Sequence, residues 1–126
     1  MEMNVELLSF FAKMPEAFPL YEAVAARVCG ALANVGVQVK KTQISFVNKH
    51  LFACVSLPFR RMKDRPDVYI ILTFGLNHRV EHPRIAQSTE PYPGRWTHHV
   101  LIQSEDEIDE QMMEWVCEAY HFAMIK

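Results

Sequence analysis

The chain lacks the sequence features by which most function classes are recognised. Its 126 residues contain no Cys-x-x-Cys pair, no glycine-rich phosphate loop, no dinucleotide-binding glycine motif and no Gly-x-Ser-x-Gly nucleophile elbow. Glycines number only four, and the three cysteines, Cys29, Cys54 and Cys117, are widely spaced among apolar neighbours. We therefore expect three buried thiols, and neither a disulfide framework nor a redox site.

Long hydrophobic runs are also missing. No apolar stretch approaches the ~20 residues that a transmembrane helix requires. The first residues, Met1-Glu-Met-Asn4, are acidic where a secretory signal would be basic. Half of the residues are apolar and 22% are charged, which is the composition of a globular protein. We expect one cytoplasmic domain over residues 1–126, without a cofactor.

Periodicity predicts helices near both ends of the chain and strands between them. Apolar residues at helical spacing predict a short helix capped by Asn4, a second helix over 19–33, and a closing helix after a capping box of Ser104 and Glu107. Residues 75–94 are expected to be a loop that ends in a type II turn. Alternating or continuous apolar segments predict five strands, over 35–39, 44–47, 51–57, 68–74 and 96–103.

This order, ααβββββα, predicts a two-layer α+β fold. We expect an antiparallel sheet of about five strands, connected as a meander, with the N-terminal and C-terminal helices packed on one face. The other face of the sheet is then free of helices. The side chains expected to point outward there are Cys54, Ser56, Tyr69, Ile71, Thr73, Thr97, His99 and Leu101.

The net charge of −2 conceals a strong segregation of charge along the chain. Residues 1–36 carry a net −2, residues 37–103 a net +6 and residues 104–126 a net −6, and five of the six histidines lie in the middle segment. Two interpretations follow. Either the basic segment forms a site for an anionic partner, or it lies beside the acidic closing helix and is neutralised there.

Basic and aromatic side chains interleave in the middle segment. That pattern suits a phosphorylated or carboxylated small molecule, or single-stranded nucleic acid. We expect Arg84 and Arg95 to hold the anion, with His99 tightening binding below about pH 6.5, the unperturbed pKa of histidine. The adjacent His98 should face the core, because neighbouring strand residues point to opposite faces. The full set of candidate ligand-binding residues is Lys41, Gln43, Arg84, Tyr92, Arg95, Trp96 and His99.

The histidines and the free sheet face leave other functions open. His78, His82 and His99 are the candidate trio for a metal, although nothing in the sequence fixes their spacing. His99 is also a candidate acid–base group of a small enzyme. The free face is, alternatively, a homodimer interface without a ligand. The favoured interpretation is a non-enzymatic module that binds an anionic partner on a basic sheet face and the 75–95 loop.

Four motifs carry a family resemblance: Lys41-Thr-Gln-Ile-Ser-Phe46, Phe52-Ala53, Pro83-Arg-Ile85 and Pro93-Gly-Arg-Trp-Thr-His-His99. Through them nearly the whole chain resembles a family of small bacterial proteins known only as a domain of unknown function. That resemblance implies a stand-alone cytosolic domain and supplies no functional residues. In layout the chain is also similar to the MmcQ/YjbR-like proteins, whose last strand begins near a tryptophan and runs into an acidic helix. The second resemblance implies a DNA-binding role by analogy.

Overall fold

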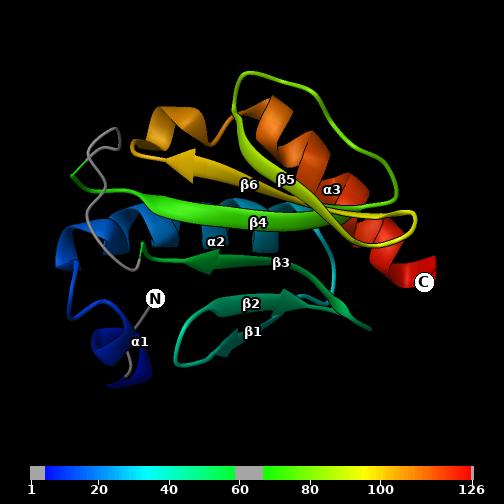
Figure 1. The fold of residues 1–126 in the computed structure, drawn as a ribbon. Helices are drawn as coiled ribbons and strands as arrows, with labels where there is room; N and C mark the ends of the chain where they lie inside the picture. Colours follow the sequence, from blue (N-terminus) through cyan, green and yellow to red (C-terminus); the bar gives the residue numbers. More distant parts are fainter. Residues whose placement is uncertain (1–4, 59–66, 126) are drawn as a thin grey trace.

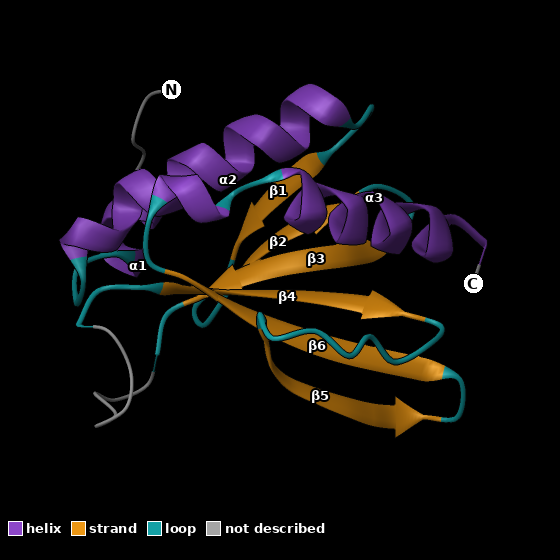
Figure 2. Ribbon diagram, turned by 90° about the horizontal axis from the view of Figure 1, so that it is seen from above, coloured by secondary structure: helices purple, strands orange, loops and turns teal. Residues whose placement is uncertain are grey.

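The computed structural model describes residues 5–58 and 67–125, which form a layer of helices on one face of an antiparallel sheet (Figure 1, Figure 2). The α+β class is thus confirmed. The helices are α1 (Val5–Phe10), α2 (Phe18–Ala31) and α3 (Glu110–Ile125), with short 3-10 helices η1 (Pro15–Ala17) and η2 (Glu105–Glu107). The strands are β1 (Gly36–Val39), β2 (Ile44–Val47), β3 (Leu51–Ser56), β4 (Ile70–Leu76), β5 (Ile85–Tyr92) and β6 (Arg95–Ile102).

The sheet has six strands in the order β1-β2-β3-β4-β6-β5, and every neighbouring pair is antiparallel. The expected meander is therefore wrong after β4. Residues 77–84 run back along the sheet beside α3, so β5 starts at the same end as β4 and forms the outer edge (Figure 2). Strand β6 then inserts between β4 and β5. This crossover places residues 77–84 in the helical layer.

Strand β5 is the element that sequence patterns missed, because it is an edge strand. Most of its side chains are exposed, so no alternation of apolar and polar residues marks it. It contains Pro91, which lacks an N–H and is tolerated at sheet edges, and its register against β6 shifts twice. The turn that follows was predicted correctly. Tyr92 pairs with Arg95, and Gly94 adopts the positive φ of 75° that glycine permits.

The core lies between the sheet and helices α2 and α3. Strand β4 crosses its centre with alternate residues fully buried, and His98 on β6 is also fully buried, as expected. Aromatic rings connect the two layers. Phe74 stacks on His98 on one side, with ring centroids 5.2 Å apart, and on Trp115 of α3 on the other, at 5.8 Å. Stacked rings of this kind add to the stabilisation from burial alone.

The helix ends differ in detail from the expected ones. The capping box of Ser104 and Glu107 is present, but it caps η2. Helix α3 begins later, where the Asp109 Oδ1 atom accepts the Met112 N–H at 3.0 Å. Asn4 lies outside the described residues. Within the described residues, no helix is both long and apolar enough to cross a bilayer.

Three burial expectations also fail. Cys54 is buried, but Cys29 is exposed and Cys117 only half-buried. Val37 was expected on a buried strand face, yet it is 42% exposed because β1 is an edge strand that helices cover incompletely. Tyr69 was expected to point outward, but only 3% of it is exposed. The other predicted outward positions do lie on the face of the sheet that no helix covers, which we call the open face.

Candidate anion-binding site

The expected site residues lie at separate corners of the sheet. Lys41 is at the tip of the β1–β2 hairpin, and Arg84 immediately precedes β5 at the opposite edge. Five strand spacings of about 4.8 Å separate those edges, or about 24 Å. Arg95 is the first residue of β6 and pairs with Tyr92 at the end of β5. At about 3.3 Å per residue, it lies roughly 20 Å from Arg84. The structure therefore does not bring Lys41, Arg84 and Arg95 into a common cleft.

Arg84 is already engaged with the acidic segment of the chain. Its Nη1 lies 2.9 Å from the Asp109 Oδ1, and its Nη2 donates to the Glu107 carbonyl at 2.6 Å. The Met112 N–H and, less strongly, the Arg84 guanidinium hold the pKa of Asp109 below its usual value. His78 similarly contacts the Glu118 carboxylate of α3. Arg84 and His78 therefore lie beside acidic residues at or within the C-terminal helix and are neutralised there, which is the second of the two interpretations of the charge segregation.

The expected uncharged residues of the site, Gln43, Tyr92 and Trp96, do not lie at one common position either. Gln43 Nε2 donates to Ser45 Oγ at 3.0 Å, so its amide is committed within the β1–β2 hairpin. Tyr92 is 68% exposed at the end of β5, opposite Arg95. Trp96 is half-buried, and the Arg79 guanidinium lies 5.9 Å from its ring centroid.

His99 lies on the open face, far from Lys41 and Gln43 in the β1–β2 hairpin. Its Nδ1 is 2.9 Å from the Thr73 hydroxyl, and burial lowers its pKa. Three to four strand spacings, roughly 15–20 Å, separate its strand from β1 and β2. Residues paired across neighbouring strands form a row over the whole sheet at this level, and none of them is Lys, Arg, Asp or Glu. The row consists of Gln38, Ser45, Cys54, Thr73, His99 and Gln87.

The open face is therefore not basic. The strands contain a single basic residue, Arg95, at one end of β6, and a single acidic residue, Glu90. The remaining described basic residues of the middle segment lie in connections between strands. Arg60, Arg61, Lys63 and Arg65 fall outside the described residues. The metal trio does not assemble either, because His78 and His82 lie on the helical side and His99 on the other. No group of three or more potential ligands in 5–58 and 67–125 is arranged to hold a metal.

The burial and hydrogen bonding of His98 predict that acid will destabilise the fold. The His98 Nε2 accepts the Val80 N–H at 2.9 Å, so the proton of the neutral ring is on Nδ1, which makes no hydrogen bond with residues 5–58 or 67–125. Burial lowers the pKa of His98. A proton added at Nε2 would remove the acceptor of Val80 and place a charge in the core.

We expect the free energy of unfolding to fall as the pH decreases below about 6.5, the pKa of an unfolded histidine. A histidine whose folded pKa is depressed stabilises the fold above that pH, and loses up to about 1.4 kcal/mol per pH unit below it. The variant His98→Gln, which keeps an acceptor but does not titrate, should be less stable at pH 7.5 and less sensitive to acid. Urea unfolding between pH 5 and 7.5 measures both effects.

The control for this prediction is His50→Gln, because His50 is exposed in the β2–β3 turn. His78 works in the opposite direction. Its hydrogen bond to Glu118 raises its pKa, so its contribution is present below about pH 6.5 and is lost at higher pH. Parallel stability–pH curves for wild type and His98→Gln would contradict the assignment to His98.

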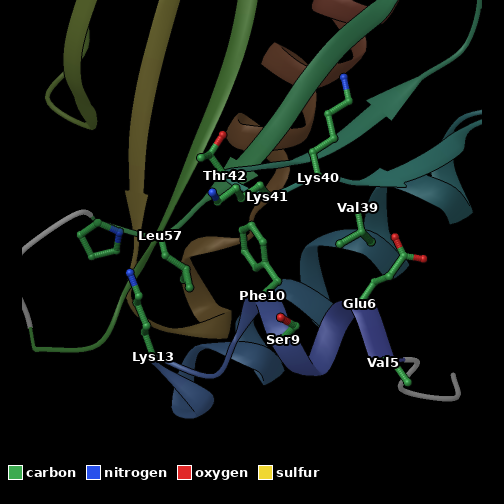
Figure 3. A pocket seen from close by; sticks show the side chains of 11 residues that line it. Val5, Glu6, Ser9, Phe10, Lys13, Val39, Lys40, Lys41, Thr42 and Leu57 are labelled. Carbon is green, nitrogen blue, oxygen red and sulfur yellow. The ribbon is translucent and has the colours of Figure 1, made fainter.

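A cavity of about 600 Å³ lies between α1, the tip of the β1–β2 hairpin and the end of β3 (Figure 3). We call it the lysine pocket. In the view of Figure 3, Lys13 and Lys41 lie on one side of the Phe10 ring and Glu6 on the other, while Lys40 extends away from the others. The lining residues are Val5, Glu6, Ser9, Phe10, Lys13, Val39, Lys40, Lys41, Thr42, Leu57 and Pro58.

Local structure fixes both walls of the lysine pocket. On one wall, the Lys40 N–H donates to the Gln43 carbonyl at 2.9 Å, which closes a tight hairpin with Lys41 and Thr42 at its tip. On the other wall, Phe11 anchors the end of α1. It is 3% exposed and contacts Phe18 of α2 at a centroid distance of 5.4 Å. Helix α1 and the turn that follows it are thereby held so that Ser9 and Lys13 line the cavity.

The electrostatics of the lysine pocket differ from those around Arg84. No ion pair within the described residues joins Lys13 or Lys41 to a carboxylate. Lys40 also lines the cavity, but its side chain extends away from Lys13 and Lys41 (Figure 3). Burial raises the pKa of the Cys54 thiol, and the charge of Lys40 slightly offsets that rise. Two lysines with no ion-pair partner in the described part of the chain, together with the hydroxyls of Ser9 and Thr42, form a lining that can bind a carboxylate or phosphate.

Sequence patterns identified only Lys41 of this pocket. Ser9 was missed because it belongs to a short helix read as apolar, and Lys13 because it lies in the turn after that helix. Thr42 was noted only as part of a family motif. One local signal did exist. Adjacent Phe10 and Phe11 cannot both face the core of one short helix, so one of them must cover another surface.

Comparison with known proteins supplies a family but no activity. No curated protein and no solved structure matches the chain. The likeness to the MmcQ/YjbR-like proteins, and the bacterial origin, therefore stay predictions. The expected family resemblance is confirmed, because a family model described as a domain of unknown function (DUF5655) matches residues 9–123. The chain thus belongs to the DUF5655 family.

Proposed function

We propose that this protein binds a small anionic ligand in the lysine pocket and does not transform it. The observation that carries the proposal is the pair of lysines, Lys13 and Lys41, that line one cavity and form no ion pair with any carboxylate of residues 5–58 and 67–125. By contrast, Arg84 already binds Asp109, and Arg79 lies 3.7 Å from Glu81. The proposal retains the anion expected from the sequence but moves it from the sheet face to this pocket.

The shape and charge of the molecule favour a small ligand over nucleic acid. A nucleic-acid site needs basic groups spaced along a groove or stripe. Here the described basic side chains are divided among separate corners, and the sequence pI is about 6.3. A cavity of about 600 Å³ instead falls within the range of small-molecule sites, roughly 300–1,000 Å³.

Isothermal titration calorimetry with inorganic phosphate tests the proposal directly. We expect saturable binding at 20 mM salt that weakens severalfold at 300 mM, because added ions screen exposed charges. A single-stranded oligonucleotide serves as the competing probe. The absence of phosphate binding at both salt concentrations, or affinity independent of salt, would rule out the proposed function.

A second candidate function is assembly of two copies through the open face of the sheet. It is favoured by the uncharged row from Gln38 to Gln87, because two-fold pairing of such a face brings no like charges together. If the wild type is a dimer in sedimentation velocity, Leu101→Glu should convert it to a monomer. Leu101 is half-buried on the open face, whereas substitution of Tyr69 would disrupt the core. A wild type that stays monomeric at high concentration would exclude this candidate.

A further inference from the structure

We propose that the ligand of the lysine pocket is amphipathic: a carboxylate or phosphate ester with one anionic end and a short hydrocarbon or ring-bearing body. This inference rests on the proposed function and adds the chemical class of the ligand. It is carried by three features of the cavity, namely its size, its apolar lining and the position of Glu6.

The cavity is much larger than an anionic group alone requires. At about 30 Å³ of liquid volume per water molecule, its volume of about 600 Å³ corresponds to about twenty waters. A phosphate or carboxylate group bound at Lys13 and Lys41 would fill only a small part of that space. The remainder is available to the body of a ligand.

The lining beyond the lysines is apolar. Phe10, Val39 and Leu57 are half-buried there, each with part of its surface still in contact with solvent. Phe10 is the central side chain of the view in Figure 3, between the lysines and Glu6. A ligand body that covered these three side chains would remove apolar surface from water on both partners, which is favourable.

Glu6 determines where the ligand's charge can be. In Figure 3 its carboxylate lies on the opposite side of Phe10 from Lys13 and Lys41. A ligand with anionic groups at both ends would bring one of them toward Glu6, and like charges repel. The arrangement therefore selects an anion with its charge at one end and an apolar body that passes over Phe10.

A series of alkyl phosphates tests this inference. Methyl, propyl and hexyl phosphate, at concentrations below micelle formation, are compared with inorganic phosphate by calorimetry. We expect binding to tighten by up to about fourfold for each methylene that enters the cavity. In Val39→Thr, which replaces one methyl group by a hydroxyl of similar size, that gain per methylene should shrink. The matched control is Val37→Thr, two residues along the same strand face and outside the lining.

The outcomes separate the two proposals. Phosphate binding with no dependence on chain length would overturn the amphipathic ligand but leave anion binding intact. Equal effects of Val39→Thr and Val37→Thr would also overturn it. Failure of every anion to bind would instead overturn the proposed function. Co-sedimentation with phosphatidylglycerol vesicles, without binding of soluble alkyl phosphates, would assign the surface to a membrane and contradict a soluble ligand.

Discussion

The variant Lys41→Glu is expected to bind inorganic phosphate at least tenfold more weakly than the wild type. Two unit charges 4 Å apart in bulk water interact by about 1 kcal/mol. Reversing one charge beside a divalent anion therefore changes the interaction by about 4 kcal/mol at that distance. Side-chain flexibility and salt reduce this value, so the prediction is a loss of at least about 1.4 kcal/mol, or tenfold. Calorimetry at low salt measures it.

Several controls make this prediction specific to the lysine pocket. Lys49→Glu makes the same charge change in the β2–β3 turn, at the other end of β2, and should alter affinity little. Lys41→Arg should retain most of the binding, because the charge remains. Arg84→Gln and Arg95→Gln test the location expected from the sequence, and neither should weaken binding here. Equal losses for Lys41→Glu and Lys49→Glu would indicate general electrostatics without a site.

The largest effect on stability is expected for Trp115→Ala, a loss of about 3–5 kcal/mol in the free energy of unfolding. Trp115 is 5% exposed, stacks on Phe74 and meets the edge of the His82 ring at a centroid distance of 5.0 Å. Its removal would leave a cavity among α3, β4 and residues 77–84. Urea unfolding followed by far-UV circular dichroism measures the change without depending on tryptophan fluorescence.

The matched control is Trp96→Ala, because Trp96 is the other tryptophan and is only half-buried. The variant Trp96→Ala removes less buried surface than Trp115→Ala, together with one cation–π contact to Arg79. We therefore expect its free energy of unfolding to fall by much less than that of Trp115→Ala. Comparable losses for the two variants would contradict the assignment of Trp115 as the residue that attaches α3 to the sheet.

Most of the fold was predictable because burial leaves a periodic pattern. Helix α3 and strand β4 each bury one face in the core, and the spacing of their apolar residues reflects this burial. Strand β5 has no such periodic pattern. Most of its side chains are exposed and do not pack in the core, so only its backbone pairing with β6 defines it. The crossover between β4 and β5 is likewise a property of the assembled layers.

The proposed site keeps the chemistry that the sequence suggested but not the expected location. Charge segregation left open an anionic partner or internal neutralisation, and Lys41 was among the candidate residues. Which cations remain available depends on tertiary pairing, however. Residues 77–84 pass beside α3, so Arg84 meets Asp109 and His78 meets Glu118. Lys13 lines the same cavity as Lys41 only because α1 lies beside the β1–β2 hairpin, and no pattern within either segment predicts that arrangement.

The most direct test of anion binding in the lysine pocket is an ¹H–¹⁵N NMR titration of the protein with inorganic phosphate. The account predicts saturable shifts confined to the amides of Ser9 to Lys13, Lys40 to Thr42 and Leu57. Lys41→Glu should abolish these shifts while the rest of the spectrum is unchanged. Shifts centred on Arg84 and Arg95, with the amides of α1 and the β1–β2 hairpin unaffected, would contradict it.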